Sequence, residues 1–266
     1  MDAFPWEDLR KACAAGDQAA LETIVSGAAN CDPSLLLPRA FHCAWEQGQR
    51  QLCKWILERS WRECLLEAFN DGDLPKVQWL YKRVRKHFCD DKDDQMFRFV
   101  QACTKGHLHL AQWVLSDAVS LGLWDDHDVH DATATALSHA CGHGRLHVVQ
   151  WLKSLLPDEG GSEYLYAAAC EGHLRVVQWL CAVNDPSDDD PGQEDVFHDD
   201  LCVESAFLGA CMRGHDTVAR WFIQRYPEWG EAWDEAGIRR LQTWSAPRDA
   251  WMRAVVRTNQ APVQCM

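Results

Sequence analysis

One pattern of four residues recurs along this chain and restricts what the chain can fold into. An alanine is followed by a glycine four residues later, and the glycine by a leucine at two residues and a tryptophan at seven. The pattern is complete around Gly106, Gly144 and Gly172, and a copy at Gly214 has Asp216 in place of its leucine. Weaker copies are centred on Gly16, Gly48 and Gly72. We therefore expect a repeat protein.

The pattern around each glycine predicts a helix, a turn and a second helix. Alanine and cysteine before the glycine are small enough for a short first helix to pack closely, and glycine can end that helix in the left-handed conformation. After Gly144, apolar residues recur at helical spacing, interrupted by Gln150 and Lys153. These apolar residues are Leu146, Val148, Val149, Trp151, Leu152 and Leu155. One helix pair cannot bury such a stripe alone, whereas stacked copies can.

Three segments carry a resemblance to a known family. GHLRVVQWL at 172–180, GRLHVVQWL at 144–152 and GHLHLAQWV at 106–114 resemble the second helix of ankyrin repeats, in the tryptophan-containing form common in protists and large amoeba viruses. Gly16 and Gly214 lie 198 residues apart over six intervals, a mean of 33, which is the ankyrin period. The Thr-Pro-Leu-His that normally opens an ankyrin first helix is missing, so the hairpin loops are expected to be short or irregular.

The resemblance implies an all-α, ankyrin-type helix-turn-helix solenoid over residues 1–226, with about seven repeats and a degenerate first one. Gly48 and Gly72 are only 24 residues apart, so the second helix after Gly48 is expected to lead almost directly into the next first helix. Residues 227–266 leave the pattern at Pro227, and helices are expected over 231–244 and 245–257. This C-terminal segment is either a helical cap on the last repeat or a docking element.

The cysteines and the hydropathy pattern indicate where such a chain resides. Of the 13 cysteines, Cys13, Cys103, Cys141 and Cys211 each lie three residues before a marker glycine. Adjacent helices pack about 8–10 Å apart, whereas a disulfide needs Cα atoms within about 7 Å. These thiols are therefore interpreted as buried packing residues in a reducing compartment, either the cytoplasm or the nucleus. We find no apolar run near 18 residues and no secretory signal, so no membrane partner is expected.

Negative charge is concentrated in three segments that follow the second helices. Segments 90–94, 124–131 and 184–200 carry −3, −4 and −8, against a net charge of −14 for the whole chain. Placed at the hairpin tips of a solenoid, they either keep the chain soluble or steer a protein partner with a basic surface. Calcium binding is a weaker alternative because the EF-hand spacing is absent.

Histidines gather in one part of the chain without forming a recognisable site. His127, His130, His139, Cys141, His143 and His147 could be zinc ligands by residue type. However, a glycine separates His143 from His147, and Cys141 belongs to the packing positions. The histidines that follow marker glycines, His107, His173 and His215, are interpreted as local hydrogen-bonding residues of the turn. Because no catalytic motif is present, we expect no enzyme, no cofactor, no metal and no small-molecule substrate.

The predicted function is recognition of a protein partner through the concave face and the acidic loops. Nucleic acid is disfavoured, because a phosphate-binding groove needs clustered Lys and Arg. The resemblance implies that contacts come from the residues just before each marker glycine and from the acidic segments. These are Glu46, Gln47, Asn70, Asp71, Thr104, Lys105, Asp125, Asp126, His143, Glu171, Asp188, Asp189, Asp190, Met212 and Arg213. The alternative is a structural brace in a large assembly, anchored by the C-terminal segment.

Overall fold

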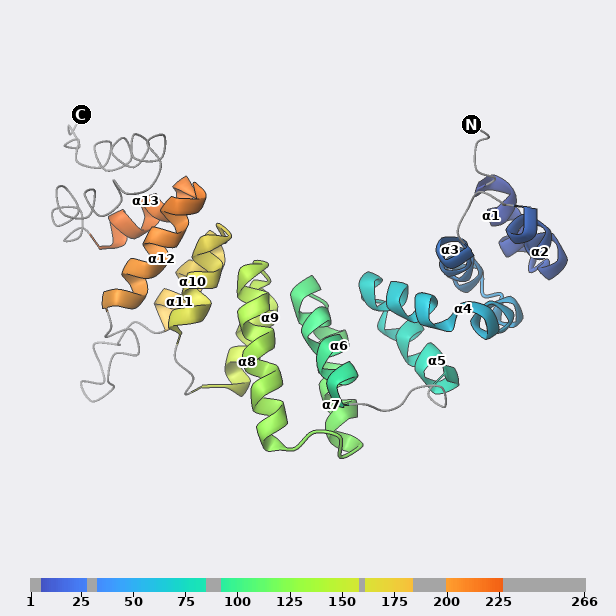
Figure 1. Ribbon diagram of the computed structural model, residues 1–266, viewed down its shortest axis with the longest axis horizontal. Coiled ribbons are helices and arrows are strands. Elements are labelled where there is room, and N and C mark those ends of the chain that lie inside the picture. Colours follow the sequence, from blue (N-terminus) through green and yellow to red (C-terminus); the bar gives the residue numbers. More distant parts are fainter. Residues whose placement is uncertain (1–5, 28–32, 85–91, 158–160, 184–199, 227–266) are drawn as a thin grey trace. The chain divides into compact units, whose positions relative to one another are not determined.

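The computed structural model describes residues 6–27, 33–84, 92–157, 161–183 and 200–226, which form thirteen α-helices and no strand (Figure 1). This confirms the predicted all-α class. The helices are α1 (Trp6–Ala15), α2 (Gln18–Gly27), α3 (Pro33–Glu46), α4 (Arg50–Asp71), α5 (Leu74–Val84), α6 (Lys92–Lys105), α7 (Leu108–Ser120), α8 (Asp126–Gly142), α9 (Leu146–Leu155), α10 (Ser162–Cys170), α11 (Leu174–Val183), α12 (Asp200–Arg213) and α13 (Asp216–Arg225). Within these ranges, no helix is long and apolar enough to cross a membrane. Segment 227–266, with its expected helices, lies outside them, as do Asp188, Asp189 and Asp190.

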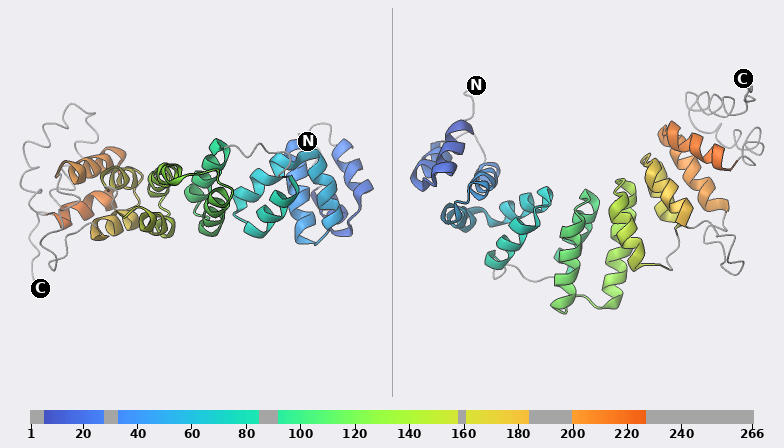
Figure 2. Two further views of the ribbon diagram at one scale, coloured as in Figure 1. Left: turned by 90° about the horizontal axis from the view of Figure 1, so that it is seen from below. Right: turned by 180° about the vertical axis from the view of Figure 1, so that it is seen from behind.

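The helices form two compact units, one of residues 1–98 with 109–123 and the other of residues 99–108 with 124–266. In the first unit α1 packs on α2 and α3, and α4 packs on α3 and α5. In the second unit α8 packs on α9 and α10, and α10 packs on α11 and α12, which in turn contacts α13. These helix pairs of the second unit follow one another as a stack in both views of Figure 2.

The same turn ends the helix before each of the seven marker glycines. Every one of these glycines has a φ between 69° and 88°, the left-handed region predicted for it. At Gly144 the glycine N–H donates to the Cys141 carbonyl at 3.2 Å, and the next N–H, of Arg145, donates to the Ala140 carbonyl at 2.9 Å. This pair of bonds is the Schellman motif, and it recurs at all seven glycines. The alanine of the repeat pattern is the residue whose carbonyl accepts the longer-range bond.

Marker glycines also make room for the following repeat. The His173 ring lies over Gly144, and its Nε2 is 2.9 Å from the Gly142 carbonyl oxygen. A Cβ at position 144 would come within 2.6 Å of that ring, and a Cβ at Gly172 within 2.4 Å of the His215 ring. These histidines therefore link successive repeats, which corrects the expectation that they serve their own turn. His147 behaves likewise, since its Nε2 is 2.8 Å from the Gly106 carbonyl oxygen.

The apolar stripe after Gly144 is only partly buried. Val148, Val149 and Leu152 have no exposed surface, as predicted. Leu146 and Trp151 are half-buried and Leu155 is 42% exposed, whereas Lys153, which interrupts the stripe, is 7% exposed. Lys153 is thus buried although it is charged, because the long aliphatic part of a lysine can be buried with the helix.

The repeat tryptophans pack between repeats and are only half-buried. In the first unit the Trp79 ring lies 5.2 Å from that of Trp45, and the Trp113 ring 5.0 Å from that of Tyr81. In the second unit the Trp151 ring lies 6.2 Å from that of Phe99. These three tryptophans therefore pack against aromatic rings of a neighbouring repeat, although none of them is fully enclosed. Edge-to-face contacts of this kind add to the gain from burial.

Two helix boundaries follow local sequence signals. Helix α4 continues through the short interval between Gly48 and Gly72, as predicted, with a kink at Ser60 (φ −148°, ψ 48°). The Ser60 hydroxyl donates to Glu63 at 2.9 Å, so the S-x-x-E spacing marks where the next first helix begins. Helix α3 begins at Pro33 and contains Pro38, so the second proline does not interrupt the helix.

Two of the three acidic segments contain the first turn of a helix. Helix α8 begins at Asp126, so most of segment 124–131 is helix. Asp125 and Asp128 exchange side chain–backbone hydrogen bonds in a capping box, at 2.9 and 3.2 Å. Helix α6 similarly begins at Lys92, with Asp93 and Asp94 in its first turn. Aspartates at these positions favour the positive end of the helix dipole, which gives part of the acidity a structural role.

The four cysteines of the repeat pattern are buried, with exposures of 0–4%. Burial raises the pKa of the Cys13 and Cys141 thiols to about 12 and shifts those of Cys103 and Cys211 upward as well. Thiols in this environment act as small packing groups and stay protonated at neutral pH.

The double role of Gly144 predicts unequal effects of alanine at two marker glycines. Gly214→Ala should cost about 1–2 kcal/mol from the left-handed backbone alone, since no atom of the described residues lies within 4 Å of a Cβ there. Gly144→Ala should cost about 1–3 kcal/mol more, because the His173 ring must also move. Urea unfolding followed by circular dichroism measures both losses.

A second variant tests the cause of that difference. Replacing His173 by alanine removes the ring over Gly144, so the extra loss at Gly144→Ala should shrink in the His173→Ala background. Equal losses for Gly144→Ala and Gly214→Ala in the wild-type background would contradict the inter-repeat role of the glycine.

Candidate functional site

Helices that precede marker glycines, called inner helices here, line one concavity in each unit. In the second unit a groove of about 650 Å³ lies on α8, α10 and α12. We call it the inner groove. Its lining residues are Ser138, His139, Gly142, His143, Tyr166, Ala167, Cys170, Glu171, His173 and Arg213.

Polar bridges between repeats shape the inner groove. An Arg213 Nη1 lies 2.7 Å from Glu171 Oε1, which joins the end of α12 to the end of α10. His173 joins the turn after α10 to the Gly142 carbonyl at the end of α8. The His143 Nδ1 is 2.9 Å from the His139 carbonyl oxygen of its own helix. The groove therefore carries both charges and several hydrogen-bonding groups at its surface.

Tyr166 is the large aromatic side chain of the inner groove, and it is 46% exposed. A Cβ on Gly209 of α12 would come within 2.4 Å of Cys170 Sγ and 3.1 Å of the Tyr166 ring. Glycine at that position thus lets α12 approach α10 and leaves Tyr166 at the surface. A hydrogen bond to Cys170 raises the pKa of the Tyr166 hydroxyl, which therefore stays protonated at neutral pH.

Of the residues predicted to contact a partner, His143, Glu171 and Arg213 are brought together in the inner groove. The other predicted contact residues that the structure describes in the second unit are not among its lining residues. Lys105 is exposed, Thr104 and Met212 are half-buried, and Asp125 and Asp126 are exposed at the start of α8. In the first unit Glu46, Gln47, Asn70 and Asp71 are exposed but do not line that unit's pocket.

Sequence reasoning missed the residues five and six positions before each marker glycine. In the inner groove these are Ser138, His139, Tyr166 and Ala167. They lie one helical turn before the predicted contact positions and therefore share their face. Applying the i−4 relation to the predicted residues would have found them.

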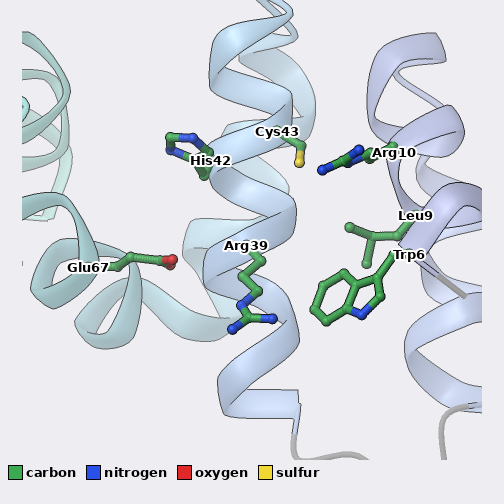
Figure 3. A pocket seen from close by; sticks show the side chains of 7 residues that line it. All are labelled: Trp6, Leu9, Arg10, Arg39, His42, Cys43 and Glu67. Carbon is green, nitrogen blue, oxygen red and sulfur yellow. The ribbon is translucent and has the colours of Figure 1, made fainter. Parts of the chain in front are cut away.

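One of two concavities in the first unit, called the N-terminal pocket here, lies on α1, α3 and α4 and has a volume of about 380 Å³. Figure 3 shows Trp6, Leu9 and Arg10 reaching it from α1, with Arg39, His42 and Cys43 on α3 and Glu67 on α4. Arg10, His42, Cys43 and Glu67 occupy the same two repeat positions that line the inner groove. The two concavities therefore have the same origin in the repeat but different chemistry.

A buried lysine adjoins the N-terminal pocket. Lys76 is 2% exposed, and its Nζ lies 2.9 Å from His42 Nδ1, 3.3 Å from Asp73 and 3.6 Å from Asp71. Asp71 was predicted to contact a partner, but here it neutralises this lysine. A buried ammonium group needs such partners.

Glu67 brings a buried oxygen without a hydrogen-bond partner to the N-terminal pocket. Its Oε2 is buried and makes no hydrogen bond among the described residues. Burial first, and the charge of Asp71 second, raise the pKa of the Glu67 carboxyl above its usual value of 4.5. His42, Arg39 and Lys76 act in the opposite direction.

The histidine cluster noted in the sequence is spread over separate interactions. His127 and His130 lie 3.3 and 3.7 Å from Asp131, whereas His143 and His147 contact different carbonyls and Cys141 is buried. No group of three or more metal-ligating side chains occurs within the described ranges.

Successive helix pairs, joined by identical glycine turns and linked by side chains from one repeat to the next, define a helical repeat protein of the solenoid class. Residues 99–195 match the family model described as ankyrin repeats, with three copies. Residues 99–195 thus carry ankyrin repeats, as the sequence pattern suggested. A search among curated proteins finds no match. Ankyrin repeats generally mediate protein–protein interaction and are typically not enzymes.

The raised pKa of Glu67 predicts a pH-dependent gain from Glu67→Gln. Above pH 4.5 the carboxyl ionises more readily in the unfolded chain than in the folded one, so its contribution to stability falls as pH rises through the raised value. Glutamine does not ionise, and the variant should melt at a higher temperature than wild type at pH 7.5. The difference should shrink towards pH 4.

Glu58→Gln is the matched control, since Glu58 lies on the same helix and is exposed. Calorimetry from pH 4 to 8 compares the three proteins. A Glu67→Gln difference that is constant with pH would contradict a role for ionisation.

Proposed function

We propose that this chain is a non-catalytic recognition module whose second unit binds a protein partner through the inner groove. The observation that carries the proposal is the convergence of His143, Glu171 and Arg213, from three successive inner helices, on one groove. All three residues are among those that the resemblance to ankyrin repeats implies as partner contacts.

The chemistry of the inner groove suits a protein surface. Tyr166 offers an exposed aromatic ring, and tyrosine and arginine are enriched among residues that dominate binding energy. The Glu171–Arg213 pair offers an acceptor and a donor side by side. A partner that places a side chain against Tyr166 and polar groups against this pair would use both features.

The partner is proposed to have a basic surface and to meet the chain in the cytoplasm or nucleus. The net charge of −14 and the acidic segments support the first part, with Asp126 exposed at the start of α8. The buried, protonated cysteines support a reducing compartment. The structural-brace alternative depends on residues 227–266, which lie outside the described ranges, so no observation here favours it.

Truncating the inner groove should remove partner binding. A variant with Tyr166→Ala, Glu171→Ala and Arg213→Ala should recover at least tenfold less partner, since each central contact contributes more than about 1 kcal/mol. Quantitative mass spectrometry of affinity-purified tagged protein from the cells that produce it measures recovery. The control variant, Gln150→Ala with Gln178→Ala, changes exposed residues on α9 and α11, which are outer helices, that is, helices that follow a marker glycine. Identical recoveries for the two variants would refute the groove.

Charge reversal tests the basic partner separately. Asp188→Lys with Asp190→Lys should slow association and weaken its dependence on salt between 50 and 200 mM NaCl, because steering by exposed charges is screened. Surface plasmon resonance with the partner identified above gives both rates. Glu7→Lys with Glu58→Lys makes the same change of charge on exposed residues of the first unit. An unchanged rate in the first variant would count against the acidic segments.

A further inference from the structure

Two arginines that line the N-terminal pocket form no ion pair with a carboxylate of the described residues. Arg10 on α1 and Arg39 on α3 are exposed and line the pocket from two sides (Figure 3). Neither forms an ion pair or a hydrogen bond with any residue of the described ranges. In the inner groove, by contrast, Arg213 is paired with Glu171 at 2.7 Å.

Trp6 holds one of these guanidinium groups in place. The Arg39 Cζ lies 4.7 Å from the centre of the Trp6 ring, which is 38% exposed. Stacking on an aromatic ring uses the face of a guanidinium and leaves its N–H groups, which lie in the plane, able to donate. Leu9, at 1% exposure, supplies a fixed apolar wall next to the indole.

Glu67 gives the pocket a hydrogen-bond acceptor, in contrast to the donors of the two arginines. Its buried Oε2 has no hydrogen-bond partner among the described residues, and such a group costs free energy until a donor reaches it. In Figure 3 Glu67 extends towards α3 from the side away from Trp6. The pocket therefore presents donors at one end and an acceptor at the other.

The positive charge of these two arginines is opposite in sign to the net charge of the chain as a whole. The chain has 40 acidic and 26 basic side chains, so carboxylates outnumber cationic groups. Neither arginine of the pocket nevertheless forms an ion pair within the described ranges, although the Arg39 charge acts on Glu67. The anion that would complete the pocket is thus expected from another molecule, and a pocket of this volume accepts one or two side chains.

We propose that the N-terminal pocket binds an acidic peptide segment of a partner protein. An Asp or Glu carboxylate of the segment lies between Arg10 and Arg39, and a neighbouring apolar side chain packs on Trp6 and Leu9. A backbone N–H of the segment donates to Glu67. This site goes beyond the inner groove, because it lies in the other unit and selects the opposite charge.

Peptide display on the full chain tests the proposal directly, because a random library offers acidic and non-acidic segments alike. A random 12-residue library is selected in parallel on wild type, on Arg10→Gln with Arg39→Gln, and on Arg175→Gln with Arg220→Gln. The last variant loses the same charge from exposed residues of α11 and α13. Circular dichroism and thermal melting check that all three proteins fold.

The expected result is a family of acidic peptides enriched by wild type and by the Arg175/Arg220 control but lost with Arg10→Gln/Arg39→Gln. Absence of acidic peptides from the wild-type pool would overturn the proposal. Equal loss in both variants would do the same, since it would show that net charge alone retains them.

The affinity of one selected peptide is then measured for each protein. Fluorescence anisotropy should show at least tenfold weaker binding to Arg10→Gln/Arg39→Gln, and a similar loss when the acidic residue of the peptide is changed to its amide. Binding should be unchanged in the Tyr166→Ala, Glu171→Ala, Arg213→Ala protein. Loss in that protein would place the peptide in the inner groove and refute the N-terminal pocket. Failure of either site can thus be recognised independently of the other.

Discussion

The structure depends on one turn that serves two repeats at once. In each copy a glycine in the left-handed conformation closes a Schellman motif on the alanine four residues before it. At Gly144 and Gly172 the missing side chain also admits the histidine of the next repeat. The local end of one helix and the packing of its successor therefore rely on the same residue, which couples neighbouring repeats without a long-range core.

Both concavities arise from this arrangement. Because every inner helix ends at the same turn, residues five and six positions earlier always reach the same face. What differs is which side chains occupy these positions: Ser138, His139 and Tyr166 in one unit, Arg10, His42 and Glu67 in the other. A repeated backbone thus offers two sites of different chemistry.

The turns and the helix class could be predicted from sequence because they depend on local spacing. Gly144 and Ala140 identify the motif without reference to any other part of the chain. The errors concern contacts over longer distances. Hydropathy assigns Lys153 to solvent and Leu155 to the core, yet burial depends on how α9 meets its neighbours. Likewise, the acidity of Asp125 and Asp128 suggests a loop, whereas their hydrogen bonds begin a helix. Which of the predicted contact residues share a groove also depends on packing.

Helix α4 shows where such a chain can change length. Its single kink at Ser60 replaces the connection found elsewhere between an outer helix and the next inner helix. The turns at Gly48 and Gly72 are nevertheless intact, although they are only 24 residues apart, against 42 for Gly172 and Gly214. The length of this connection therefore varies along the chain, whereas the glycine turn does not. A repeat can thus keep the face of its inner helix whether it joins the next repeat through a kink or through a segment of many residues.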